Sequence, residues 1–107
     1  MIFSKTKNIL EDHFNVDKAQ STDIDINVTV LGEDNGEFSV SVHQGTCVIE
    51  DKHLDNPNIT VGFIDVDTMI DMFTKGANPM TLVMGGKMTV NGDFKKGREI
   101  KGLFIKE

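Results

Sequence analysis

His43, Cys47 and His53 are the residues of this chain whose types best suit metal binding or nucleophilic chemistry. Structural zinc sites usually combine four thiolate or imidazole ligands in closely spaced pairs. The His43-x3-Cys47 spacing is not such a pair, and the sequence offers no second pair. Cys47 also falls at an apolar position of a predicted strand, which favours a buried, unreactive thiol over a nucleophile paired with histidine. We therefore predict no bound metal, no cofactor and no catalytic cysteine.

Two other motifs resemble ligand-binding loops but lack a required feature. Asp23-x-Asp25-x-Asn27 begins like a calcium loop, yet Val28 occupies the position where that loop needs glycine. The segment 85–92, GGKMTVNG, has neither the spacing of a phosphate-binding loop nor a helix after its Gly-Lys pair. The sequence thus contains no catalytic set, and we predict that the protein is not an enzyme.

Length and composition narrow the class of protein. The 107 residues suffice for one hydrophobic core, so we expect a single domain over residues 1–107. The formal net charge of -6 argues against nucleic acid as a partner, since phosphates require a basic face. One cysteine excludes an internal disulfide, and neither a secretory signal nor a bilayer-spanning stretch is recognisable. These features predict a cytoplasmic protein.

Alternation of apolar and polar residues predicts the strands. Ile24, Ile26 and Val28 share one face of the first strand, and Asp25 and Asn27 share the other, so this strand has one wet side. Polar turns join the first three strands as an antiparallel meander. We expect an α+β fold with a five-stranded, mainly antiparallel sheet whose apolar face is covered by helices. The predicted strands span residues 24–30, 38–43, 46–50, 58–64 and 87–91.

Apolar stripes at helical spacing predict the helices that position these strands. Asp65 can cap a helix over residues 66–73, which Gly76 ends. Asn78-Pro79 starts a short helix over residues 80–84, which the pair Gly85-Gly86 ends. We also expect an amphipathic N-terminal helix and a C-terminal helix over residues 94–105.

The segment 78–93, NPMTLVMGGKMTVNGD, resembles the C-terminal part of the sterol carrier protein type-two family, the intracellular non-specific lipid-transfer domain. The shared features are an acidic, apolar helix, an Asn-Pro step, a short apolar helix and a Gly-Lys strand ending at Gly92. In that family the sheet and helices enclose an apolar tunnel that holds sterols, fatty acids or acyl-CoA. The resemblance therefore implies a lipid-binding protein with an apolar tunnel.

The resemblance also identifies positions that match the lining of the family's tunnel, on the helices expected at residues 66–73, 80–84 and 94–105. We expect a lipid-sized cavity between these three helices. Five of the six methionines fall between Met69 and Met88, and flexible, polarizable side chains suit variable apolar ligands. Ordinary core packing is the alternative explanation of the same stripes. The matching positions are Met69, Ile70, Phe73, Met80, Val83, Met84, Ile100, Leu103 and Phe104.

Charge is divided unevenly along the chain. Residues 1–74 contain 4 basic and 14 acidic side chains, a net charge of -10, whereas residues 75–107 contain 7 basic and 3 acidic ones, a net charge of +4. One interpretation is a solvated helix face that balances an acidic sheet. The functional interpretation is transient contact with an anionic membrane surface through Lys95, Lys96, Arg98 and Lys101.

These observations predict intracellular binding and carriage of a lipid, such as a fatty acid, an acyl-CoA or a sterol-like molecule, without covalent chemistry. The alternative is an accessory or dimerisation module of the same fold that transfers no lipid. The sequence does not determine the oligomeric state, and a dimer is left open. Side chains that fill the cavity would favour the module, and an open apolar cavity would favour the carrier.

Overall fold

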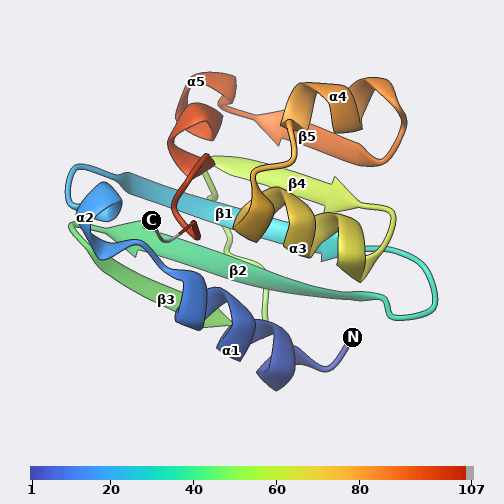
Figure 1. Ribbon diagram of the computed structural model, residues 1–107, viewed down its shortest axis with the longest axis horizontal. Helices are drawn as coiled ribbons and strands as arrows, with labels where there is room; N and C mark the ends of the chain where they lie inside the picture. Colours follow the sequence, from blue (N-terminus) through green and yellow to red (C-terminus); the bar gives the residue numbers. More distant parts are fainter. Residues whose placement is uncertain (106–107) are drawn as a thin grey trace.

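The computed structural model describes residues 1–105; the single domain predicted over 1–107 also includes residues 106 and 107, which lie outside the described range. The predicted strands and helices occur in the predicted order, and a short helix at Val16–Ala19 and a 3-10 helix at Arg98–Ile100 are additional (Figure 1). The elements are α1 (Phe3–His13), α2 (Val16–Ala19), β1 (Asp23–Val30), β2 (Gly36–His43), β3 (Thr46–Glu50), β4 (Ile59–Phe63), α3 (Val66–Lys75), α4 (Pro79–Met84), β5 (Met88–Gly92), α5 (Phe94–Gly97) and the 3-10 helix η1 (Arg98–Ile100).

The five strands form one sheet in the order β3-β2-β1-β4-β5. The first three strands are an antiparallel meander, and β5 pairs with β4 antiparallel. Only the pairing of β1 with β4 is parallel, because the chain leaves β3 at one edge and returns beyond β1. The predicted α+β fold with a mainly antiparallel five-stranded sheet is therefore confirmed.

The helices of the described residues lie on one face of the sheet, with α1 on the β2–β3 side and α3 over β1 and β4 (Figure 1). That face carries the alternating apolar residues, and Ile24, Ile26 and Val28 of β1 are fully buried there. Phe73 of α3 packs edge-on against Phe104, with 5.5 Å between the ring centroids. On the other face the loop after β3 covers Asn27, whose side chain exchanges hydrogen bonds of 2.8 and 2.9 Å with the backbone of Leu54.

Local capping fixes the two helices that precede β5. The Asp65 carboxylate accepts a 2.7 Å hydrogen bond from the Thr68 N–H, and Gly76 ends α3 in the left-handed conformation. Asn78 then caps α4 by accepting from the Met80 N–H at 2.9 Å. Hydrogen bonds from Thr68 also lower the pKa of the Asp65 carboxyl. The start and end signals in the sequence thus predicted this part of the fold correctly.

The C-terminal helix is shorter than the predicted span of residues 94–105. Helix α5 ends at Gly97, η1 ends at Ile100, and the following residues form a turn. Gly102 adopts a φ of 84°, which an uninterrupted right-handed helix cannot contain. Leu103 and Phe104 enter the core from this turn, where the Leu103 carbonyl accepts a 2.7 Å hydrogen bond from the Asn15 N–H.

Candidate functional site

A pocket of about 620 Å³ lies where α4 and α5 face the β4–β5 edge of the sheet. Its volume is within the range of about 300–1,000 Å³ that is usual for small-molecule sites. In Figure 1, α4 and α5 stand on either side of this region above β4 and β5. The lining residues are Ile59, Val61, Met72, Asn78, Pro79, Met80, Val83, Met88, Val90, Phe94, Lys95, Gly97, Arg98, Ile100 and Lys101.

The pocket has an apolar floor and an exposed apolar rim. Ile59 and Val61 of β4 project from the covered face of the sheet and are almost fully buried. Three further residues of the floor, which belong to other elements, are buried to a similar degree. Met80 and Phe94 are 71% and 66% exposed, so the two helices leave large apolar side chains in contact with water at the mouth. The other floor residues are Met72, Met88 and Ile100.

Basic side chains border the same pocket. Lys95, Arg98 and Lys101 belong to its lining, and within the described residues 1–105 the lining contains no acidic residue. An apolar cavity beside cationic groups suits a molecule with a long apolar part and an anionic end, since each part then meets its complement.

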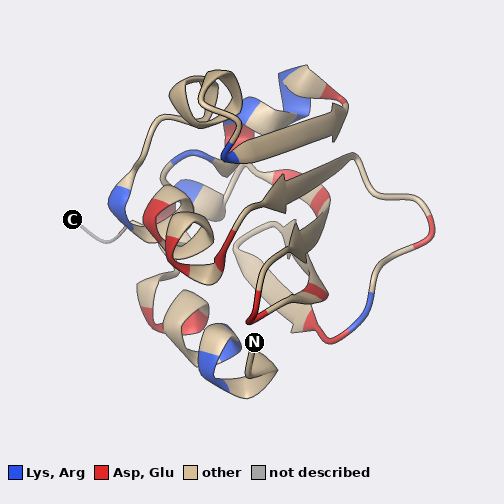
Figure 2. Cartoon of the chain, turned by 90° about the vertical axis from the view of Figure 1, so that its right-hand side faces the viewer, with Lys and Arg blue, Asp and Glu red and all other residues tan. Residues whose placement is uncertain are grey.

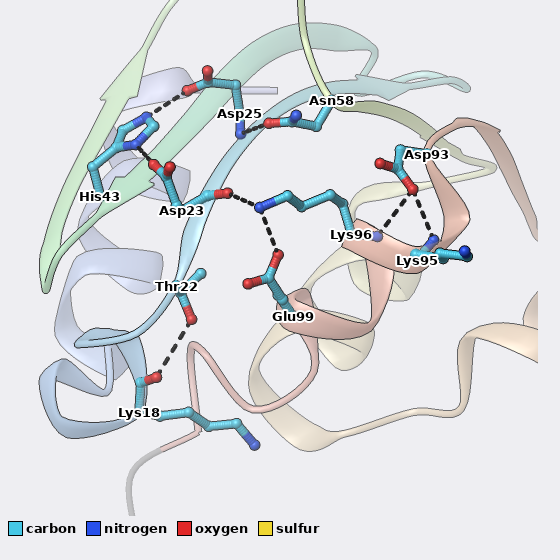
Figure 3. Close-up of polar contacts among 10 residues, drawn as sticks. All are labelled: Lys18, Thr22, Asp23, Asp25, His43, Asn58, Asp93, Lys95, Lys96 and Glu99. Atoms are coloured by element: carbon cyan, nitrogen blue, oxygen red, sulfur yellow. Dashed lines mark hydrogen bonds and ion pairs between the residues drawn. The ribbon is translucent and has the colours of Figure 1, made fainter.

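Hydrogen bonds hold α5 in place above the end of the sheet. The Asp93 carboxylate caps the helix by accepting from the Lys95 and Lys96 N–H groups at 3.0 and 3.2 Å. The Lys96 ammonium donates a 2.7 Å hydrogen bond to the backbone carbonyl of Asp23 and lies 3.3 Å from a Glu99 carboxylate oxygen. Figure 3 shows Lys96 reaching back toward β1, away from Lys95. Lys96 thus anchors α5, whereas Lys95 belongs to the pocket.

The nine positions that the sequence associated with a tunnel are distributed over three environments. Met80, Val83 and Ile100 line the pocket. Ile70 is partly buried against the core, and Met84 is 84% exposed outside the lining. A tunnel and the role of these positions in binding stay predictions. The remaining four, Met69, Phe73, Leu103 and Phe104, are buried in the core.

The positions predicted from the sequence omit most of the residues that line the pocket. Val61, Met88 and Val90 were assigned to strands, but alternation does not reveal which part of a sheet face is left uncovered. Met72 lies one residue away from the core residue Phe73 on α3, and Phe94 was expected within a longer helix. These residues line a pocket because β5 lies at the edge of the sheet and α5 is short, and neither feature is visible in the sequence pattern.

The residues first considered for chemistry do not come together as a catalytic group. Cys47 pairs with Val42 across β2 and β3, whereas His43 pairs with Thr46, so Cys47 and His43 point to opposite faces of the sheet. Burial raises the pKa of the Cys47 thiol to about 12. Within residues 1–105, no group of three or more histidine, cysteine, aspartate or glutamate residues is arranged to hold a metal ion.

His43 instead forms a polar cluster with two aspartates of β1 (Figure 3). One ring nitrogen contacts the Asp23 carboxylate, and the other lies 2.9 Å from the Asp25 carboxylate. Hydrogen bonds to Asp25 and Asp23 raise the pKa of His43 above its usual value. The cluster lies on the face of the sheet opposite the helices, so it contributes nothing to the pocket.

Residues 12–105 match the model of the SCP-2 sterol transfer family. The chain belongs to this family. Membership in the SCP-2 family implies lipid binding or lipid transfer as the general function. Among curated proteins, none matches the sequence. Among the helices of the described part of the chain, none is both long enough and apolar enough to cross a membrane.

Solved structures share this fold at low sequence identity. The sec-alkylsulfatase Pisa1 from Pseudomonas sp. has a TM-score of 0.76 and 20% identity over 92% of this chain, which spans only 15% of the sulfatase chain. The sterol carrier protein domain 2 of Helicoverpa armigera has a TM-score of 0.70 and 14% identity, covering 92% of this chain and 81% of that one. Palmitated SCP2L2 from Aedes aegypti has a TM-score of 0.63 and 12% identity, and the match covers 92% of this chain and 89% of that one. These likenesses show the SCP-2 fold alone.

Proposed function

We propose that residues 1–107 act as one lipid-binding unit that carries a single-chain lipid in the pocket between α4 and α5, without covalent chemistry. The observation that carries this proposal is the 620 Å³ apolar pocket in a member of the SCP-2 family. Burying about a dozen methylenes gains roughly 0.8 kcal/mol each, near 10 kcal/mol before the entropic cost of binding is subtracted. An affinity in the micromolar range follows, which suits a carrier that must release its ligand.

The rim favours a fatty acid or acyl-CoA over a sterol. Lys95, Arg98 and Lys101 can meet a carboxylate or phosphate while the acyl chain lies against the floor. The palmitated form of the Aedes aegypti relative also supports an acyl chain as ligand. A sterol has only a hydroxyl group to offer these cations, so it gains less from them.

Two observations support a carrier rather than an enzyme. A cysteine with a pKa near 12 supplies almost no thiolate at neutral pH. Both ring nitrogens of His43 contact aspartates on the far face of the sheet, so His43 is not placed to act as a base on a molecule in the pocket.

A cytoplasmic location of the protein also stays a prediction.

Native mass spectrometry of the freshly purified full chain tests the proposal, followed by titration of delipidated protein with a fluorescent fatty acid. We expect copurifying adducts with the masses of acyl lipids and one binding site per chain. Palmitate should compete better than hexadecanol, which has the same chain but no charge, by about two- to fivefold, the value of a partly exposed ion pair. Absence of both adducts and binding would refute the carrier and favour the accessory module.

A further inference from the structure

The mouth of the pocket is surrounded by exposed apolar side chains. Met80 and Phe94 line it, and Met84 continues the row of Met80 one turn further along α4 at 84% exposure. The whole of α4, PMTLVM, contains no charged residue and is uniformly tan in Figure 2. Exposed apolar groups gathered around one opening usually mark an interaction site.

Basic residues complete this surface. Lys95, Arg98 and Lys101 border the same opening, and Lys96 is excluded because its ammonium group is held by Asp23 and Glu99. Two acidic residues of this segment, Asp93 and Glu99, are engaged in capping α5 and in pairing with Lys96. Most other acidic side chains belong to residues 1–74, and Figure 2 shows them spread over the rest of the molecule. A planar anionic surface would therefore attract this face and repel the others.

We infer that Met80, Met84 and Phe94, with Lys95, Arg98 and Lys101, form a docking surface for an anionic phospholipid bilayer. The apolar side chains enter the interfacial region while the cations meet phosphate and carboxylate headgroups. This inference rests on the proposed function, because the docked face is the mouth of the proposed lipid site. Docking would let an acyl chain move between bilayer and pocket without crossing water.

Charge complementarity distinguishes the bilayer from a second copy of the chain. Two copies that met through this face would bring three cations of each copy together with no acidic lining residue opposite them. Like charges in a shared interface disfavour association. An anionic bilayer instead offers apolar depth and negative charge together.

A single tryptophan provides the test, since the chain contains none of its own. Phe94→Trp and, separately, Met84→Trp place the probe on the proposed surface of the full chain. Val48→Trp is the matched control, because Val48 is 47% exposed on β3, at the opposite edge of the sheet from β5. Emission is recorded with vesicles of phosphatidylcholine alone and of phosphatidylcholine mixed with phosphatidylserine, at low and high salt.

We expect a blue shift for both surface probes with the anionic vesicles at low salt, and none for Val48→Trp. Replacing Lys95, Arg98 and Lys101 together by glutamine in the Phe94→Trp chain should weaken vesicle binding about a hundredfold, about fivefold for each residue. High salt should weaken it too, since the Debye length falls to a few ångströms. Each of these results supports the docking surface.

The absence of any response to vesicles would overturn the inference, and so would three kinds of emission shift. They are equal shifts with neutral vesicles, a shift of Val48→Trp as large as that of Phe94→Trp, and a shift that depends on protein concentration without vesicles, which would indicate self-association. Titration of each variant with fluorescent fatty acid in the absence of vesicles separates the two proposals. A chain that binds the fatty acid but shows no vesicle response refutes docking alone.

Discussion

Filling the pocket from α4 should abolish most lipid binding at little cost in stability. Val83 lines the pocket and is 43% exposed, so its replacement by tryptophan directs a large ring toward an opening that already exists. If the indole takes the place of about four methylenes of an acyl chain, the loss is about 3 kcal/mol, or about a hundredfold in affinity. The free energy of unfolding should change by less than about 0.5 kcal/mol, as is usual for exposed positions.

The matched control for this change is Thr81→Trp. Thr81 is exposed on the same helix but does not line the pocket, so the control introduces the same ring into α4 without obstructing the site. The assay is displacement of a fluorescent fatty acid from delipidated protein, with thermal unfolding measured in parallel. Because the chain has no other tryptophan, the emission of Val83→Trp should also change directly when residual ligand enters.

Two results would refute the reasoning. Unchanged affinity of Val83→Trp with normal stability would show that the ligand does not occupy this pocket. A loss of about 1 to 3 kcal/mol of stability, which is the usual cost of overpacking a core, would instead show that α4 is packed against the sheet with no space to fill. Such a loss should lower the unfolding midpoint by at least about 4 °C.

Four further predictions concern helix capping, two residues outside the pocket and the position of α5. Asp65→Ala should cost about 1 kcal/mol and lower the unfolding midpoint by about 4–8 °C, whereas Asp65→Asn should retain most of the capping energy. Because the pKa of His43 is raised in the folded state, its protonation stabilises the folded chain below about pH 6.5, and this contribution is lost as pH rises through the folded-state pKa. The difference in unfolding free energy between wild type and His43→Gln should therefore shrink from about pH 6 to about pH 8. Denaturant unfolding at each pH measures it. Cys47, with its pKa near 12, should react with iodoacetamide at pH 8 far more slowly in the native chain than in urea, and equal rates by mass spectrometry would contradict its burial. Lys96→Met should remove about 1 kcal/mol by releasing α5 from Asp23, and Lys95→Met, whose ammonium group lies outside this contact, should leave the thermal midpoint unchanged.

The sequence was most informative where a local signal decides the local structure. Asp65, Gly76 and Asn78 are capping residues whose side chains or backbone conformations act within a few positions, so the helix boundaries beside them were predicted closely. The strands were equally readable, because apolar residues alternate with polar ones along them. The wet side predicted for the first strand is only partly exposed, since the loop after β3 buries Asn27. The parallel pairing of β1 with β4 was not readable, since it depends on where a loop places the chain relative to strands far away in sequence.

The candidate site was less predictable because an apolar stripe does not reveal what it packs against. Met69 and Phe73 face the core from α3, while Met72 reaches the pocket, although all three are apolar residues of one helix. The methionine-rich segment lies next to the pocket, but its individual residues divide between core, pocket and surface, and their role in ligand binding stays a prediction. Met84 illustrates the limit, because an apolar residue next to the lining is almost fully exposed.

The interruption of the C-terminal helix accounts for the error in the prediction, and it falls in a segment that lines the pocket. A helix over the predicted residues 94–105 would have been continuous, but α5 ends at Gly97 and η1 ends at Ile100. Lys101 is extended, with a ψ of 122°, and Gly102 has a φ of 84°, so the chain turns after Ile100. Leu103 and Phe104 enter the core beside Phe73, whereas residues of α5 and η1 stay at the pocket wall. The short α5 covers too little of the edge strand to close the space above Val61 and Met88. The apolar opening at this edge of the sheet therefore lies beside the point where the predicted helix breaks, which no periodic pattern in the sequence reveals.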